Sequence, residues 1–166
     1  SYLPNIEAAN FIAKKILPKL LKKLPNIKIL IAGSNPSNRV LKLSNKNIEV
    51  HGWVEDIRKT YSSGKIFFAP MTIGSGLQNK LLEAMSTSIP CITSELSNRS
   101  LKAINNKNIL IGNSVNEYIN HIISLLKDEK KRKIIGNSGR KYVIENYKWN
   151  TANEKLLRLL KSKQNI

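Results

Sequence analysis

The chain has 166 residues, of which 41% are hydrophobic, and this is enough for one domain with a core of its own. Its single cysteine, Cys91, excludes an internal disulfide framework and fits a reducing compartment. The N-terminal residues lack a basic region followed by a long apolar stretch, and no run of about 18 apolar residues occurs. We therefore expect neither a secretory signal nor a membrane span.

The net charge of +17 comes from lysines and arginines that cluster in two parts of the chain. One cluster is the segment 13–23, AKKILPKLLKK, and the other is the C-terminal third, which includes KDEKKRKIIG at 127–136. Such charge attracts polyanions, so nucleic acid and anionic lipid headgroups are both candidate partners. The alternative is that these lysines only solvate the outer faces of helices.

Helix and strand patterns alternate along the chain. Apolar residues at spacings of three and four predict an amphipathic helix over 5–24, which Pro18 is expected to kink or split. A buried strand follows over 25–33, then a turn and a short helix over 34–45. Further strands are predicted at 47–53, 65–70, 89–94 and 108–112, and further helices at 54–64, 76–88, 114–128, 129–147 and 150–163. Glu55 and Asp56 are expected in the first turn of their helix, where acids favour the dipole.

Apolar strands that alternate with helices indicate a parallel sheet covered on both faces. We therefore predict an α/β fold, a doubly wound Rossmann-like parallel sheet, with residues 1–166 forming a single domain. The chain opens on a helix, whereas a doubly wound unit normally begins with a strand. We expect the first strand, and whatever precedes it, to lie before Ser1, so that the chain is half of a larger protein.

Three glycine turns follow predicted strands, at 32–36, 51–53 and 70–76. Ligands of parallel α/β sheets bind outside the carboxyl ends of the strands. In the third turn, Gly74 and Gly76 let the backbone come close to a ligand. The N–H groups of Gly76, Leu77 and Gln78 are expected to start the next helix and to suit a phosphate or diphosphate.

Two charged side chains follow this loop on the same predicted helix. Lys80 would add a positive charge about one turn into the helix, and Glu83 would suit a sugar diol one turn later. The alternative is an ordinary tight turn between strand and helix, with Glu83 in solvent, because glycines at this spacing are a weak signal on their own.

The remaining candidates are interpreted more plainly. Cys91 lies in an apolar strand and is predicted to be a buried structural thiol rather than a nucleophile. His51 ends a strand beside Gly52 and is a candidate for lining the cleft, although a structural or incidental role is preferred. His121 lies in the middle of a helix and is expected to be incidental. The other candidates for lining the cleft are Gly33, Ser34, Asn35, Met71 and Thr72.

The segment 50–94 resembles the nucleotide-sugar-binding half of retaining glycosyltransferases with the two-domain GT-B fold, of the group 1 or family 4 type. Their C-terminal domains carry G-x-V-x-D, a strand ending in A-P, a glycine loop, L-E-A-M-A and P-V-I-T. The matching residues here are Gly52, Val54, Asp56, Ala69, Pro70, Gly74, Gly76, Leu82, Glu83, Ala84, Met85 and Pro90. The segments 2–36 and 108–150 are similar to the start and the end of such domains.

The resemblance implies a role for each part of the loop. The amides after the glycine loop would hold the diphosphate of the donor, with Lys80 as the candidate stabiliser of the leaving group. Glu83 would bind the ribose hydroxyls. The residues Trp53, Val54 and Glu55 would lie near the nucleobase. No metal is expected at the active site, and no cofactor besides the nucleoside-diphosphate sugar that serves as donor substrate.

The sequence also departs from the family pattern. Ser75 stands where many members carry a second glutamate that contacts the transferred sugar, although a G-S-G-x-x-x-K subset matches the loop here. Ser88 stands where glycine is usual. Trp149 resembles an aromatic position that packs on the sheet or serves the interdomain hinge. The family's phosphate-binding Arg/Lys pair and its acceptor site are not found, so we expect the chain alone to bind donor weakly and not to turn over.

The expected function is that of a donor-binding domain in an enzyme that passes a sugar to a glycan or lipid-linked acceptor, in bacterial capsule or lipopolysaccharide biosynthesis. Its expected partners are its own N-terminal acceptor domain and an anionic membrane surface, reached through the basic first helix. The expected location is cytoplasmic, peripheral on the inner face of the membrane. Half of a GT-B nucleotide-sugar epimerase is one alternative. A nucleic-acid-binding module is the other, disfavoured because aromatic residues make up only 6% of the chain.

Overall fold

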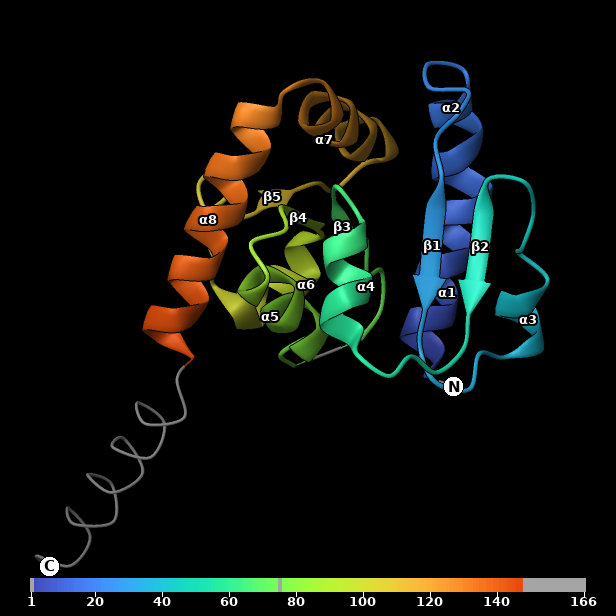
Figure 1. Cartoon of the computed structure of the whole chain (residues 1–166), viewed down its shortest axis with the longest axis horizontal. Helices are drawn as coiled ribbons and strands as arrows, with labels where there is room; N and C mark the ends of the chain where they lie inside the picture. Colours follow the sequence, from blue (N-terminus) through green and yellow to red (C-terminus); the bar gives the residue numbers. More distant parts are fainter. Residues whose placement is uncertain (1, 75, 148–166) are drawn as a thin grey trace, which may run out of the picture.

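The computed structural model describes residues 2–74 and 76–147, and the predictions for Ser75, Trp149 and a helix at 150–163 lie outside these ranges. Within them, the predicted alternation of helices and strands is confirmed (Figure 1). The elements are α1 (Leu3–Phe11), η1 (Ile12–Ile16), α2 (Leu17–Leu21), β1 (Ile29–Ala32), α3 (Asn38–Leu41), β2 (Ile48–His51), α4 (Ile57–Ser63), β3 (Phe67–Ala69), α5 (Asn79–Ser86), β4 (Cys91–Thr93), α6 (Glu95–Leu101), β5 (Leu110–Ile111), α7 (Val115–Lys127) and α8 (Glu129–Asn146).

All strand pairs in the described part of the chain are parallel, which confirms the α/β fold class. The strands form two sheets, one with the order β1-β2 and one with the order β3-β4-β5. In the first, Ile29 lies opposite Ile48, and in the second, Phe67 lies opposite Cys91. The sequence predicted one continuous sheet. The described residues instead leave β1 and β3 as the end strands of two separate sheets (Figure 1).

The first helix is continuous through Pro18, but it changes its pitch before the proline. Residues Ile12–Ile16 form one turn of π-helix, and Leu17 and Pro18 then open α2. Proline has no N–H and its ring clashes with the carbonyl of the preceding turn, so a wider turn relieves the conflict. The predicted kink is therefore a local widening of the helix.

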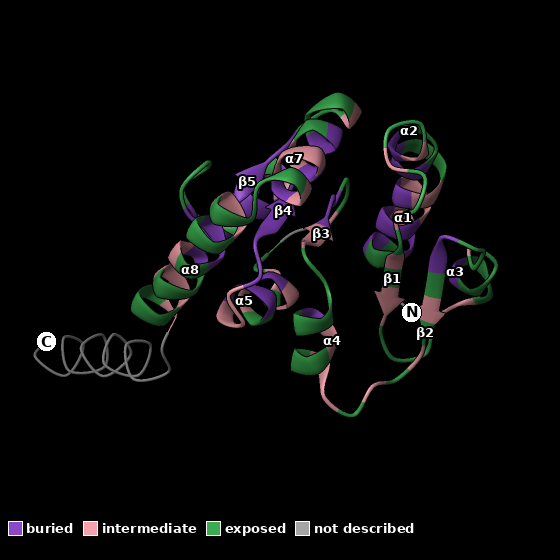
Figure 2. Cartoon of the chain, turned by 45° about the horizontal axis from the view of Figure 1, so that its top comes forward, coloured by how far each residue is buried: buried purple, intermediate pink, exposed green. Residues whose placement is uncertain are grey.

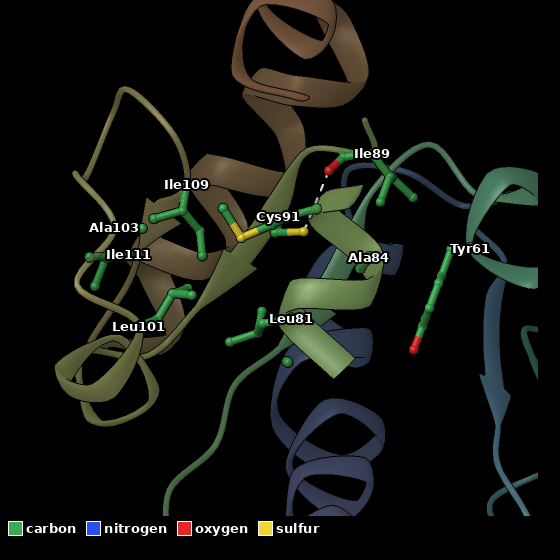
Figure 3. Packing of buried hydrophobic residues seen from close by; sticks show 11 residues of the cluster. Tyr61, Leu81, Ala84, Ile89, Cys91, Leu101, Ala103, Ile109 and Ile111 are labelled. Carbon is green, nitrogen blue, oxygen red and sulfur yellow. Dashed lines mark hydrogen bonds between the residues drawn. The ribbon is translucent and has the colours of Figure 1, made fainter. Parts of the chain in front are cut away.

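The core lies on both faces of the three-stranded sheet (Figure 2). Successive strand residues point to opposite faces, so Cys91 belongs to one apolar cluster and Ile92 to the other. The Cys91 cluster packs among residues of α5 and α6 and the stretch leading to β5 (Figure 3). The Ile92 cluster packs against α7 and the η1–α2 segment. This two-sided burial explains why the strands are apolar at nearly every position.

Helix α8 lies close to the turn between α5 and β4. A Cβ added at Gly136 would stand 1.9 Å from the carbonyl oxygen of Ser88, so only glycine fits there. Ser88 itself has φ +63°, a left-handed conformation that favours glycine. This explains why a glycine is usual at that position and why a serine there is strained.

Three local expectations were wrong. Helix α6 was missed, although Ser94 caps it and its side chain accepts a hydrogen bond from the Ser97 N–H. Helix α5 begins at Asn79 rather than Gly76. Asp56 is the N-cap of α4 rather than a member of its first turn, because its side chain accepts a hydrogen bond from the Arg58 N–H.

Candidate functional site

The carboxyl ends of β1, β2 and β3 gather the three glycine turns at one edge of the molecule (Figure 1). The N–H of Gly33 donates to the carbonyl of Gly52 over 3.3 Å, which ties the first two turns together. Helix α1 begins at the same edge, because a Cβ at Gly74 would lie 3.4 Å from the Pro4 side chain and 3.5 Å from the Tyr2 hydroxyl. The start of α1 therefore forms one wall of the third turn.

The third turn contains two glycines in left-handed conformations, with φ +111° at Gly74 and +79° at Gly76. The helix starts three residues after Gly76, with Gln78 at the N-cap position, and the Gln78 side chain does not accept a hydrogen bond from the first N–H groups of the helix. The orphan donors of α5 therefore begin at Asn79, not at Gly76 or Leu77, whose amides belong to the loop. Donors without a protein partner at a helix start suit an anion.

Lys80 lies in the first turn of α5, and its ammonium group is held by residues far away in the sequence. It donates to Asn5 Oδ1 at the start of α1 and contacts Met71 Sδ at 3.3 Å. Burial lowers the pKa of Lys80 to about 8, because the charged form is partly desolvated. A negative ligand at the α5 N-terminus would favour the charged form. Asn5 was not singled out by the sequence, since only the fold brings it to this loop.

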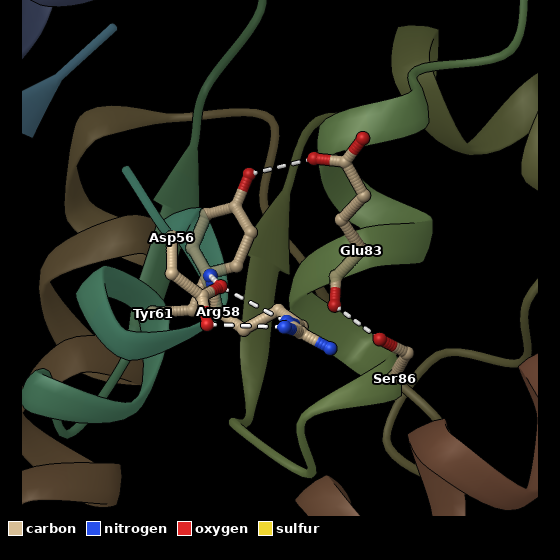
Figure 4. A network of polar contacts seen from close by, with 5 residues as sticks. All are labelled: Asp56, Arg58, Tyr61, Glu83 and Ser86. Atoms are coloured by element: carbon tan, nitrogen blue, oxygen red, sulfur yellow. Dashed lines mark hydrogen bonds and ion pairs between the residues drawn. The ribbon is translucent and has the colours of Figure 1, made fainter. Parts of the chain in front are cut away.

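Glu83 is exposed on α5, while Leu81, Ala84 and Met85 of the same helix are buried. The Tyr61 hydroxyl, from α4, donates to Glu83 Oε2 over 3.1 Å (Figure 4). Burial, and then the negative charge of Glu83, raise the pKa of Tyr61 well above its usual range, so this hydroxyl stays protonated. The Glu83 carboxylate is thus exposed to solvent, and the Tyr61 hydroxyl holds one of its two oxygens. After Asn5, Tyr61 is the second residue at this loop that the sequence did not indicate.

The residues predicted near a nucleobase lie in the loop that leads from β2 to α4 along the carboxyl edge (Figure 1). Trp53 is 74% exposed, and Glu55 is also exposed, whereas Val54 is half-buried. Asp56 fixes the end of this loop by capping α4 and by an ion pair with Arg58 at 2.9 Å (Figure 4). A large aromatic surface is therefore offered to solvent from an anchored loop.

The other predicted cleft residues are mostly at the same edge. Gly33, Ser34, Asn35 and Thr72 are exposed there, and Met71 is buried beneath Lys80. His51 is exposed, with its ring 3.6 Å from the Glu49 carboxylate.

Cys91 and His121 lie away from this edge, and each is held within the fold. Cys91 is buried, as predicted, and burial raises the pKa of its thiol, which makes it a poor nucleophile (Figure 3). The His121 ring is held at 2.9 Å by the carbonyl of Ile111.

Within residues 2–74 and 76–147, no three His, Cys, Asp or Glu side chains come close enough to share a metal ion. No described helix is long and apolar enough to cross a membrane.

The structure is a parallel α/β domain in which the N-terminus of α5 lies at the carboxyl ends of the strands and is suited to bind an anion. The family model described as "Glycosyl transferases group 1" matches residues 1–128, so the chain belongs to this family. This confirms the resemblance seen in the sequence, and the fold is that of the C-terminal half of GT-B glycosyltransferases.

Two curated relatives illustrate the likeness. An uncharacterized 44.6 kDa protein in the cps region of Klebsiella pneumoniae is 24% identical over 88% of this chain and 40% of its own length. A GDP-mannose-dependent monoacylated alpha-(1-6)-phosphatidylinositol monomannoside mannosyltransferase from Corynebacterium glutamicum is 26% identical over 89% of this chain and 42% of its own. The chain therefore spans less than half the length of these relatives.

Two solved structures share the fold. HepE from Anabaena, solved in complex with UDP, matches with a TM-score of 0.77 at 15% identity, over 93% of this chain and 46% of that one. The C-terminal domain of the group 1 glycosyl transferase LpcC from Francisella tularensis matches with a TM-score of 0.70 at 21% identity, over 90% of this chain and 83% of that one. The second match corresponds to an isolated C-terminal domain.

Proposed function

We propose that the chain is the donor-binding domain of a glycosyltransferase that uses a nucleoside-diphosphate sugar. The observation that carries the proposal is the arrangement of α5, whose free N-terminal donors, Lys80 and Glu83 all lie at the carboxyl edge. An anion site followed by a fixed carboxylate one turn later suits a diphosphate joined to a ribose.

The leaving diphosphate is assigned to the start of α5. Glycosyl transfer breaks the bond between the sugar and the diphosphate, so negative charge grows on the phosphate oxygens while an acceptor hydroxyl attacks the sugar. Backbone donors aimed at a developing charge lower the barrier because they need no reorganisation. Lys80 adds a full charge and is already held in place by Asn5 and Met71. Ser75, which the sequence places at the donor site, lies outside the described residues.

The nucleoside is assigned to Glu83 and the loop at 53–55. The carboxylate of Glu83 has two oxygens, and Tyr61 occupies one of them, which leaves accepting capacity for the ribose hydroxyls. Trp53 supplies an exposed ring on which a nucleobase can stack. HepE, which shares the fold, was solved with UDP, and the Corynebacterium relative is described as GDP-mannose-dependent. The nucleotides to be compared are therefore UDP, GDP and ADP.

The longer protein is proposed to supply the acceptor site from a separate N-terminal domain, because the chain covers 40–42% of its curated relatives. One of those relatives is encoded in a cps region, and this supports a role in surface polysaccharide biosynthesis. Under this proposal, the 166-residue chain binds the donor but does not turn it over.

Calorimetric titration with UDP, GDP and ADP tests the proposal. We expect one of the three to bind at millimolar concentration or below, and Glu83→Ala to weaken it about tenfold, the loss of a hydrogen-bonded charged group. Glu145→Ala is the matched control, since Glu145 is an exposed helical glutamate at the far end of α8. Absence of binding by all three nucleotides contradicts the donor site. Equal binding by wild type and Glu83→Ala contradicts the ribose role alone.

A membrane contact through the first helix is a separate part of the proposal. Five lysines of η1, α2 and the turn that follows are exposed, and no carboxylate among the described residues pairs with them: Lys14, Lys15, Lys19, Lys22 and Lys23. Each basic residue near an anionic surface contributes roughly 1 kcal/mol. Flotation with phosphatidylserine vesicles should recover the protein, and neutral phosphatidylcholine vesicles should not. Equal recovery contradicts this contact.

A further inference from the structure

A cavity of about 470 Å³ lies between the end of α2 and the second half of α7, two helices that Figure 1 shows next to each other. The turn after α2 leads into β1, so the cavity lies at the amino end of that strand, whereas the glycine turns lie at the carboxyl ends. The side chains that line the cavity are two lysines, two neutral polar residues and two apolar residues: Lys23, Lys127, Asn120, Ser124, Leu24 and Ile123.

The cavity has an apolar base and a basic rim. Leu24 and Ile123 are half-buried and pack against the cluster of buried residues that includes Ile92. Lys23 and Lys127 are both exposed, one from each wall. A group bound here would therefore meet two ammonium groups outside and hydrocarbon inside.

Ser124 is oriented by a third lysine. The ammonium group of Lys131, from α8, donates to Ser124 Oγ over 2.7 Å. A hydroxyl has one proton and two lone pairs, so a hydroxyl that accepts from an ammonium group keeps its own proton to donate. Asn120 precedes Ser124 by about one helical turn and adds an amide N–H₂ on the same side of α7. Two neutral donors thus lie between the two lysines of the rim.

The carboxylates nearest in sequence are engaged elsewhere. Asp128 accepts from the Lys131 N–H over 2.8 Å as the N-cap of α8, and Glu129 pairs with Lys133 at 2.8 Å. Among the described residues, no carboxylate lies within salt-bridge distance of either lysine of the rim. Arg132 Nη1 donates to two carbonyls in the last turn of α7, which offsets the negative end of that helix. The cavity is therefore positive and has donors without anionic partners.

We propose that this cavity binds a phosphate monoester, either as the headgroup of a lipid or as a soluble ester. Lys23 and Lys127 supply the charge, while Ser124 and Asn120 donate to the phosphate oxygens, which accept several hydrogen bonds at once. The apolar base contacts the carbon chain of the ester. The site lies away from the glycine turns and is independent of the proposed donor-binding function.

Titration of the 166-residue chain with glycerol 3-phosphate, followed by backbone amide chemical shifts, tests the site. We expect saturable shifts at 23–24 and 120–127, a set separate from the start of α5. The double variant Lys23→Gln/Lys127→Gln should weaken this binding about tenfold. Its matched control is Lys42→Gln/Lys107→Gln, which removes the same charge from two exposed lysines elsewhere and should leave the affinity almost unchanged.

Ser124→Ala separates a built site from general attraction to a basic surface, because it keeps every charge. We expect it to weaken binding about fivefold, and Ser124→Thr, which keeps the hydroxyl, to retain most of the affinity. Equal weakening by the two double lysine variants, or no effect of Ser124→Ala, overturns the proposal. So does the absence of shifts at 23–24 and 120–127.

Vesicles distinguish the two sources of the phosphate. Phosphatidylcholine vesicles contain either phosphatidic acid, a monoester, or phosphatidylglycerol, a diester, at the same surface charge. Greater recovery with phosphatidic acid that Ser124→Ala abolishes supports a lipid headgroup. Equal recovery with both lipids, together with saturable binding of glycerol 3-phosphate, supports a soluble ester. No nucleotide is present in these experiments, so their failure leaves the donor site to its own test.

Discussion

The hydroxyl of Tyr61 fixes the orientation of the Glu83 side chain by donating a hydrogen bond to its carboxylate. Tyr61→Phe removes that hydroxyl but keeps the ring, which packs edge-on against Phe67 at 5.2 Å. We therefore expect the nucleotide affinity to fall about fivefold, near 1 kcal/mol, with the unfolding temperature almost unchanged. Titration calorimetry and thermal unfolding measure the two quantities.

A double-mutant comparison shows whether Tyr61 acts through Glu83. In a Glu83→Ala background, Tyr61→Phe should have no further effect on affinity, since its partner is gone. An undiminished effect in that background would mean that the hydroxyl contacts the ligand itself.

Lys80 gives nucleotide binding a pH dependence. Burial lowers its pKa from 10.5 to about 8, so the free protein loses this charge as the pH rises through 8. Binding of a diphosphate should weaken about tenfold between pH 7.5 and 9, and Lys80→Met should bind weakly at both. The stability of the free protein should change in the opposite sense, rising between pH 8 and 10.5, because the unfolded chain binds the extra proton there. A wild-type affinity that is flat over this range contradicts the role of Lys80.

At the scale of elements, the contact of α8 with the α5–β4 turn depends on the absence of a side chain at Gly136. Gly136→Ala would push a methyl group against the Ser88 carbonyl, so it should reduce the free energy of unfolding by about 1–3 kcal/mol. Asn137→Ala is the matched control, because Asn137 is the next residue of the helix and is exposed. Urea unfolding compares the two variants. Equal stabilities would mean that α8 does not pack as closely as described.

The elements also show where sequence reasoning succeeds. The five strands were predicted because each is a short apolar run ended by glycine, proline or a cap, and those signals are local. Helix α6 was missed because Leu96 and Leu101 are its only apolar residues and it follows β4 after a single residue. The start of α5 was misplaced because the loop after Gly76 carries no side chain that caps the helix.

At the scale of the whole molecule, the candidate site was only half predictable. Lys80 and Glu83 follow the glycine loop in the sequence, so spacing alone pointed to them. Their partners are Asn5, 75 residues away from Lys80, and Tyr61, 22 residues away from Glu83. Only the folded arrangement of α1 and α4 around α5 makes such pairs, and no local pattern signals them. The division of the sheet at β1 and β3 depends in the same way on which strands are neighbours.

The net charge of +17 raises a question about the whole molecule, because any nucleotide is an anion and the basic helix faces attract anions without specificity. Backbone amide chemical shifts distinguish binding at the donor site from non-specific binding to the basic helix faces. They are mapped during titration with the nucleoside diphosphate that binds most tightly. We expect the shifts to gather at 76–80 and 53–55, and inorganic triphosphate to reproduce only the first group. Shifts gathered on the lysine-bearing segment 14–23 instead would contradict a donor site at the start of α5.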